Sequence, residues 1–290
     1  MTEPAPRSQD LPERVGVVGG GRMGAGVAHA LLTSGAAVTV VEVDSRLDAA
    51  RSRVEDAVRA SAQRGTLEQT VDAVLDRLTV TSDASRLAGA GLVVEAVPED
   101  IAVKTAALQR IADAVDGACV VATNTSSLPV AELALAVPEP ARFLGMHFFN
   151  PVPASRLVEV VVGPATDPGV VDRVVAWVGR LGKAAVVVQD SPGFASSRLG
   201  LALGLEAIRM VEQGVASPAD IDTAMELGYK HPTGPLRLTD LVGLDVRLGI
   251  AEHLARTLGE RFAPPQLLRD MVARGELGRK SGQGFYSWPA

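Results

Sequence analysis

The sequence predicts an α/β domain with a doubly wound, mostly parallel sheet, followed by an all-α domain. Three observations support this prediction. Short, continuous apolar runs alternate with longer amphipathic segments up to about residue 190, and a glycine-rich turn follows the first run. Beyond residue 190 the apolar residues recur at helical spacing. Alternating strands and helices are typical of a parallel sheet that is covered on both faces.

The apolar runs of the first domain are rich in β-branched residues, which suits strands that are buried on both faces. Strands are predicted at Val15–Val18, Val38–Val41, Leu78–Val80, Leu92–Val94, Val120–Ala122, Phe143–Phe149, Leu157–Val162 and Ala185–Val188. The amphipathic segments between them predict helices near residues 23–34, 46–63, 67–77, 100–115 and 168–181. Prolines at 151 and 153 break strand pairing and predict a turn before the seventh strand.

The pattern changes after Asp190, where apolar spacing becomes helical. Ser217 followed by Pro218 predicts a helix start, with serine as the N-cap. The apolar segment 239–258 is predicted to be a helix that can cover more than one surface, so we expect a homodimer, the commonest symmetric assembly. The expected organisation is a flexible tail over residues 1–13, the α/β domain over 14–190 and a helical domain over 191–290.

Composition excludes several classes of protein. Hydrophobic residues make up 47% of the 290 residues, which is enough for a core, and the net charge is -6. An acidic chain disfavours nucleic acid and anionic membranes as partners, and no apolar run approaches the roughly 18 residues of a membrane span. The single cysteine, Cys119, favours a reducing, cytoplasmic location. Because the histidines are dispersed, no metal site is expected.

The glycine-rich turn forms a G-x-G-x-x-G pattern between the first strand and the following helix. Gly19 allows the tight turn, Gly21 lets the backbone approach a pyrophosphate, and Gly24 lets helix and strand pack closely. Glu42 ends the second predicted strand, where a carboxylate accepts hydrogen bonds from an adenosine ribose and repels a 2′-phosphate. The pattern therefore predicts NAD binding. If Glu42 is not the residue that binds the ribose, Asp44 is the second choice. Arg46 nearby leaves NADP open as the cofactor. The alternative to a nucleotide site is a glycine-rich turn that binds no ligand.

Two further stretches carry chemically useful side chains. Residues 123–127 follow a strand, at the edge where doubly wound sheets bind ligands. His147 is the only histidine in the predicted strands, and Glu159 lies on the next strand. A neutral histidine is a natural general base near pH 7. A histidine beside two phenylalanines is, taken alone, more often a core residue than a base.

Five motifs occur in a fixed order along the chain: Gly-x-Gly-x-Met-Gly at 19–24, Asn-Thr-Ser-Ser-Leu at 124–128, His-Phe-Phe-Asn-Pro at 147–151, Asp-Ser-Pro-Gly-Phe at 190–194 and His-Pro-Thr-Gly-Pro at 231–235. In this order they resemble the 3-hydroxyacyl-CoA dehydrogenase family, and especially its short bacterial 3-hydroxybutyryl-CoA members. The resemblance runs from about residue 14 to Trp288.

The resemblance implies a role for each matching residue. It implies that His147 is the catalytic base, that Glu159 is its partner, and that Ser126 and Asn150 donate hydrogen bonds to the substrate oxygen. Such donors stabilise the charge that develops on that oxygen. The resemblance further assigns residues to the cofactor site, with two of them near the nicotinamide ribose and amide (Glu99 and Lys104) and two within the matching motifs (Met23 and Asn124).

One position departs from the family pattern. The family usually has asparagine in Pro-Gly-Phe-x-x-Asn-Arg, whereas this chain has Ser197. A serine hydroxyl is shorter than a carboxamide and offers fewer polar groups, so we expect a weaker contact near the 3-oxygen of the acyl-CoA. CoA is expected to bind through its phosphates, with some of the arginines on the helix after Glu42 pairing with the 3′-phosphate. A solvated basic face is the alternative for each of them (Arg51, Arg53, Arg59 and Arg64).

Together these features predict an NAD-dependent (S)-3-hydroxyacyl-CoA dehydrogenase with a short-chain substrate such as 3-hydroxybutyryl-CoA. One alternative is a dehydrogenase of a free hydroxy acid or sugar acid on the same scaffold. The other is a catalytically impaired NAD-binding protein. Only the serine at position 197 favours this hypothesis.

Overall fold

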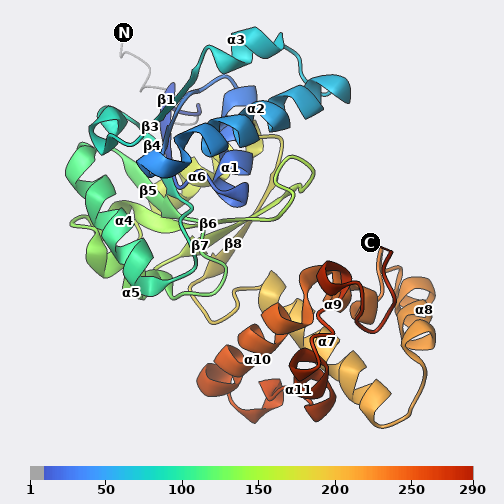
Figure 1. The fold of residues 1–290 in the computed structure, drawn as a ribbon. Coiled ribbons are helices and arrows are strands. Elements are labelled where there is room, and N and C mark those ends of the chain that lie inside the picture. The colour runs from blue at the N-terminus through green and yellow to red at the C-terminus, as the bar shows by residue number, and fades with distance from the viewer. Residues whose placement is uncertain (1–9, 290) are drawn as a thin grey trace, which may run out of the picture. The chain divides into compact units, whose positions relative to one another are not determined.

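The computed structural model describes residues 10–289, and the chain divides into two compact units after Asp190 (Figure 1). Residues 1–9 of the predicted tail lie outside the described part. Within the described part, Trp177 donates its indole N–H to the carbonyl of Asp10 over 2.9 Å, and Arg180 forms an ion pair with the Asp10 carboxylate. No helix of residues 10–289 combines the length and apolar character needed to cross a bilayer.

The first unit is built on an eight-stranded sheet in the order β3-β2-β1-β4-β5-β6-β7-β8. Every neighbouring pair is parallel except β6 and β7. The predicted doubly wound, mostly parallel sheet is therefore confirmed. The strands are β1 (Arg14–Val18), β2 (Ala37–Val41), β3 (Leu78–Thr81), β4 (Leu92–Glu95), β5 (Val120–Thr123), β6 (Phe143–Phe148), β7 (Leu157–Val162) and β8 (Ala184–Gln189).

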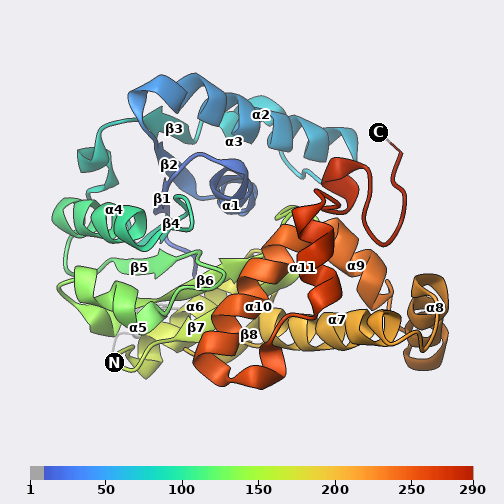
Figure 2. The same ribbon diagram turned by 60° about the horizontal axis from the view of Figure 1, so that its bottom comes forward.

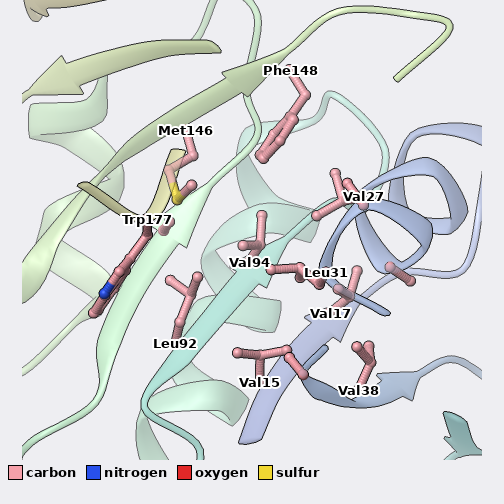
Figure 3. Close-up of a cluster of buried hydrophobic side chains, with 14 of the residues drawn as sticks. Val15, Val17, Val27, Leu31, Val38, Leu92, Val94, Met146, Phe148 and Trp177 are labelled. Carbon is pink, nitrogen blue, oxygen red and sulfur yellow. The ribbon is translucent and has the colours of Figure 1, made fainter. Parts of the chain in front are cut away.

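Helices cover both faces of this sheet. Residues of α1, α2 and α6 share one hydrophobic cluster with the strands, and α4 lies on the opposite face (Figure 2). Figure 3 shows part of the cluster, in which Val15 and Val17 of β1 pack near Leu31 of α1. The helices are α1 (Arg22–Thr33), α2 (Leu47–Gln63), α3 (Val71–Leu75), α4 (Ile101–Ala114), α5 (Val130–Leu133) and α6 (Pro168–Arg180).

The helix boundaries follow local capping chemistry. The Asp100 carboxylate accepts from the N–H groups of residues 102 and 103, and this cap begins α4 where the sequence predicted it. The helix predicted over 67–77 is wrong in extent. The side chain of Thr70 caps the helix by accepting from the N–H of residue 73, so α3 covers only Val71–Leu75.

The second unit is built from helices, as predicted: α7 (Ser196–Glu212), α8 (Pro218–Tyr229), α9 (Pro235–Val242), α10 (Leu244–Leu258) and α11 (Gln266–Ala273). Ser217 caps α8 as expected, by accepting from the N–H of Asp220. The single helix predicted over 239–258 is wrong. Gly243 has φ +105°, a conformation that glycine adopts readily, and it separates α9 from α10.

A buried histidine of α1 makes the stability of the first unit depend on pH. His29 is buried, and its ring contacts the Ser61 hydroxyl over 2.8 Å. Burial, with help from the charges of Arg64 and Lys183, lowers the pKa of His29 to about 4. Because this pKa lies below that of the unfolded chain, the neutral ring stabilises the fold fully above about pH 6.5 and loses this effect as the pH falls toward 4.

We predict that His29→Gln removes this pH dependence, because glutamine does not titrate. The free energy of unfolding of the wild type, relative to that of the variant, should fall by about 3 kcal/mol between pH 7 and pH 4. Urea unfolding at several pH values measures this difference. A difference that stays constant over this range would contradict the prediction.

Candidate active site

A cavity of about 560 Å³ opens at the carboxyl ends of the parallel strands of the first unit. Its walls come from the loops after β1, β2, β4, β5 and β6. Most of the predicted site residues line it: Gly19, Gly21, Met23, Glu42, Glu99, Lys104, Asn124, Ser126, His147 and Asn150. Ser197 is half-buried in the first turn of α7, in the second unit, and its predicted contact with substrate stays a prediction.

The glycine loop has the shape of a phosphate cradle. Gly19 has φ +101°, and a Cβ there would lie 2.7 Å from the carbonyl oxygen of Ala96. A Cβ on Gly24 would lie 1.8 Å from the carbonyl oxygen of Gly19, so the loop and α1 require glycine at this contact. A Cβ on Gly21 would meet nothing within 4 Å. The fold itself therefore does not require glycine at position 21. A reason for glycine there is that it leaves space for a ligand in the cavity.

Glu42 holds the same loop from the end of β2. One of its carboxylate oxygens accepts from the N–H of Gly20 and the other from the N–H of Val43, both over 2.8 Å. The glutamate is half-buried and lines the cavity, as does Arg46, while Asp44 is exposed and does not. The carboxylate stays where an adenosine ribose would need an acceptor, and its charge opposes a 2′-phosphate. These residues fit NAD.

His147 and Glu159 form a buried pair. They lie directly opposite each other in the antiparallel register of β6 and β7, and the ring Nδ1 is 2.8 Å from the Glu159 carboxylate. Because a carboxylate only accepts, the Nδ1–H donates to it, which makes Nε2 the acceptor of the neutral ring. The ring of Phe149 lies 4.3 Å from the imidazole, between centroids. The pair has the chemistry of an oriented general base.

Glu99 joins two parts of the cavity wall. One oxygen accepts from the hydroxyl of Thr125 and from the N–H and hydroxyl groups of Ser126 and Ser127, over 2.7–3.1 Å. The other oxygen lies 3.3 Å from the Lys104 ammonium. Burial alone raises the pKa of Glu99, but the Lys104 charge and these hydrogen bonds outweigh it and hold that pKa below its usual range. The carboxylate therefore stays ionised and orders the turn after β5.

Asn124 has a contact that the sequence did not indicate. Its side-chain oxygen accepts from the N–H of Phe148 over 2.8 Å, beside His147. This bond ties the end of β5 to the end of β6. Asn124 therefore positions the strand that carries the histidine, whether or not it also contacts a cofactor.

Glu95 is a residue of this region that the sequence did not indicate. This glutamate ends β4 and is fully buried, although the strand is otherwise apolar. It accepts hydrogen bonds from Lys104 and from the hydroxyl of Thr123. A charge at the end of an apolar strand was the available signal, since acidic residues are rarely buried without a partner.

The arginines of α2 occupy different surroundings. Arg59 forms ion pairs with Glu55 and Asp56 on its own helix. Arg53 lines a separate hollow of about 370 Å³ that Asn150 also lines. Arg64 lines a hollow of about 620 Å³ beside His29, and Arg51 lines neither. Arg53 on α2 and Arg64, the residue directly after α2, thus each face a hollow.

The sequence matches the family model for the NAD binding domain of 3-hydroxyacyl-CoA dehydrogenase over residues 14–191. It also matches the model for the C-terminal domain of the same enzymes over residues 193–288. The chain belongs to the 3-hydroxyacyl-CoA dehydrogenase family. The predicted family, the NAD-dependent dehydrogenase activity and NAD as the cofactor are thereby confirmed.

Similar members of the family align over nearly their whole length. The chain is 43% identical to a 3-hydroxybutyryl-CoA dehydrogenase of Mycobacterium tuberculosis, over 96% of this chain and 99% of that protein. It is 40% identical to a probable 3-hydroxybutyryl-CoA dehydrogenase of Deinococcus radiodurans, over 95% and 100%. The crystal structure of (S)-3-hydroxybutyryl-CoA dehydrogenase from Ralstonia eutropha superposes with a TM-score of 0.91 at 35% identity, over 96% of this chain and 100% of that one.

The glycine loop gives a direct test of the cofactor site. Gly24→Ala should destabilise the first unit and abolish NADH binding, because its methyl group overlaps the Gly19 carbonyl. Gly21→Ala should keep the wild-type thermal midpoint and weaken NADH binding at least tenfold, because its methyl group enters only the cavity. Fluorescence titration and thermal unfolding separate the two effects. NADH affinity in Gly21→Ala equal to that of the wild type would rule out close approach at this glycine.

Proposed function

We propose that the protein interconverts a short-chain (S)-3-hydroxyacyl-CoA, such as 3-hydroxybutyryl-CoA, and the corresponding 3-oxoacyl-CoA. The observation that carries this proposal is the buried His147–Glu159 pair, whose histidine lines the cavity that the glycine loop also lines. A general base next to a dinucleotide cradle is the requirement for oxidising a secondary alcohol. The printed names of the relatives favour 3-hydroxybutyryl-CoA.

His147 removes the hydroxyl proton of the substrate. With Nδ1–H donating to Glu159, the lone pair of Nε2 accepts this proton, and the nearby carboxylate stabilises the imidazolium that forms. The proton returns to the substrate oxygen in the reverse reaction. Because both side chains are buried, the stabilisation by Glu159 is screened little by solvent.

Ser126 and Asn150 are the proposed donors to the substrate oxygen. Each donor of this kind contributes roughly 2–4 kcal/mol to lowering the barrier. In the structure the Ser126 hydroxyl lies 3.1 Å from Glu99 and donates to it. Its single proton must turn from Glu99 to the substrate oxygen, while the N–H of Ser126 keeps the turn attached to Glu99.

The glycine loop and Glu42 would hold the pyrophosphate and adenosine ribose of NAD, and Glu99 and Lys104 line the same cavity as His147. When bound, NAD would supply the acceptor for the hydride that leaves C3 of the alcohol, and NADH the donor for the reverse reaction. The residues 14–190 form the NAD-binding domain. The domain 191–290 supplies contacts to the acyl-CoA, and Arg53 and Arg64 provide positive charge for the CoA phosphates.

We also propose a homodimer formed through the helical domain, in a cytoplasmic enzyme. Large apolar side chains are exposed on this domain, with Tyr229 at 76%, Leu199 at 71% and Leu227 at 68%. Exposed apolar side chains of this size support a protein interface. Size-exclusion chromatography with light scattering measures the assembly, and a monomer at micromolar concentration contradicts it.

The base is tested by NADH oxidation with acetoacetyl-CoA. His147→Gln should lower kcat about a thousandfold, the range of general base catalysis. Glu159→Gln should lower it less, about tenfold to hundredfold, because glutamine still accepts from Nδ1–H but does not stabilise an imidazolium. His253→Gln, on α10 of the helical unit, is the matched control and should leave kcat unchanged.

The proposed function fails if His147→Gln retains activity within a few-fold of the wild type. Free acetoacetate tested beside acetoacetyl-CoA separates a CoA-dependent enzyme from one that acts on free acids. Turnover of the free acid at an equal or higher kcat/KM would replace the proposed substrate class.

Ser197 is tested separately. If its hydroxyl contacts the acyl-CoA, Ser197→Ala should lower kcat/KM about fivefold, the value of one hydrogen bond. Ser197→Asn restores the usual residue of the family and should retain or raise kcat/KM. Steady-state kinetics of Ser197→Ala within twofold of the wild type would remove this residue from the site.

A further inference from the structure

A fully buried carboxylate lies behind the cavity wall. Glu95 is 0% exposed and is not among the residues that line the cavity. Its oxygens accept from the Lys104 ammonium over 2.8 and 3.1 Å, from the Thr123 hydroxyl over 2.6 Å and from the N–H of Val97 over 2.7 Å. These bonds tie β4 to three neighbours: α4, the end of β5 and the loop after β4.

Two routes lead from Glu95 to Ser126. In the first, Lys104 is 99% buried and bridges Glu95 and Glu99, and Glu99 holds the turn at residues 125–127. In the second, Thr123 donates to Glu95 while its hydroxyl oxygen accepts from the N–H of Thr125 over 3.3 Å. Both routes end on the turn that carries the proposed oxygen donor.

Opposite charges hold this arrangement together. A buried ammonium is costly unless it is paired and hydrogen-bonded, and Glu95 provides its closest carboxylate. Lys104 also donates to the carbonyl of Val97 over 3.2 Å, which fixes its position. Without the charge of Glu95, the remaining carboxylate beside Lys104 is Glu99. The ammonium would then pull Glu99 away from the turn that it holds.

We propose that Glu95 is a positioning residue that couples the cofactor wall to the substrate-oxygen donor. It fixes Lys104 and Thr123, and through them the Glu99 carboxylate and the Ser126 turn. The link to catalysis rests on the proposed function of Ser126. The link to cofactor binding does not, because Glu99 and Lys104 both line the cavity.

Glu95→Gln tests the inference, since it keeps the shape of the side chain and removes its charge. NADH, titrated by fluorescence, should bind at least fivefold more weakly. With acetoacetyl-CoA, kcat should fall about tenfold to hundredfold, the effect of misplacing a reacting group by about 1 Å. Glu139→Gln, which removes an exposed carboxylate paired with Arg142, is the matched control and should change neither value.

A double-mutant cycle with Ser126→Ala separates positioning from general destabilisation. If Glu95 acts through Ser126, the double variant should lose little more kcat than Ser126→Ala alone. Additive losses, or NADH affinity within twofold of the wild type, overturn the inference. If Glu95→Gln does not fold, the nearly isosteric variant Thr123→Val replaces it. NADH should again bind more weakly and kcat should again fall, and the same two results would overturn the inference.

Turnover by the wild type distinguishes a failure of the proposed function from a failure of the inference about Glu95. If the wild type does not reduce acetoacetyl-CoA, the proposed function fails, and the NADH titration alone then decides the role of Glu95. If the wild type is active but Glu95→Gln matches it in NADH affinity, the proposed function stands and the inference about Glu95 is overturned.

Discussion

The antiparallel pairing of β6 with β7 is the interaction on which the site depends. It is the one reversal of direction in the sheet, and its register sets Glu159 directly opposite His147. Directly opposed residues share a face of the sheet, so a slip of one position would turn one of the two side chains to the other face. A sheet register therefore fixes the pair to within hydrogen-bonding distance, which a flexible loop would not ensure.

The remaining site residues depend on the parallel part of the sheet. Parallel strands end at the same edge, so residues far apart in the sequence meet there: the glycine loop after β1, Glu42 after β2, Glu99 after β4 and Ser126 after β5. The charges at this edge are held by one another and by backbone N–H groups. Glu42 and Glu99 each accept from backbone N–H groups in addition to lining the cavity. The carboxylates of the polar wall are thus held by bonds within the chain, and groups held in this way reduce the cost of binding.

Much of the fold could be predicted because its signals are local. Continuous apolar runs marked every strand, and capping residues such as Asp100 and Ser217 marked helix starts. The errors arose where one residue overrides an otherwise helical pattern: the Thr70 side chain shortened α3, and the positive φ of Gly243 split a predicted helix in two. Glu95 was missed because its partners, Lys104 and Thr123, are its neighbours only in the folded chain.

The sequence by itself determined the family, the order of strands and helices, and the identity of the residues around the cavity, because residue types at fixed spacing carry that information. Only the tertiary structure decided which of these side chains touch. In the folded chain His147 pairs with Glu159, and the Asn124 side-chain oxygen accepts a hydrogen bond from the backbone of β6. Glu95 is connected to the Ser126 turn through Lys104 and Glu99. Hydrogen bonds and ion pairs act over about 3 Å, and distances of that size between remote residues are set by packing and register rather than by sequence spacing.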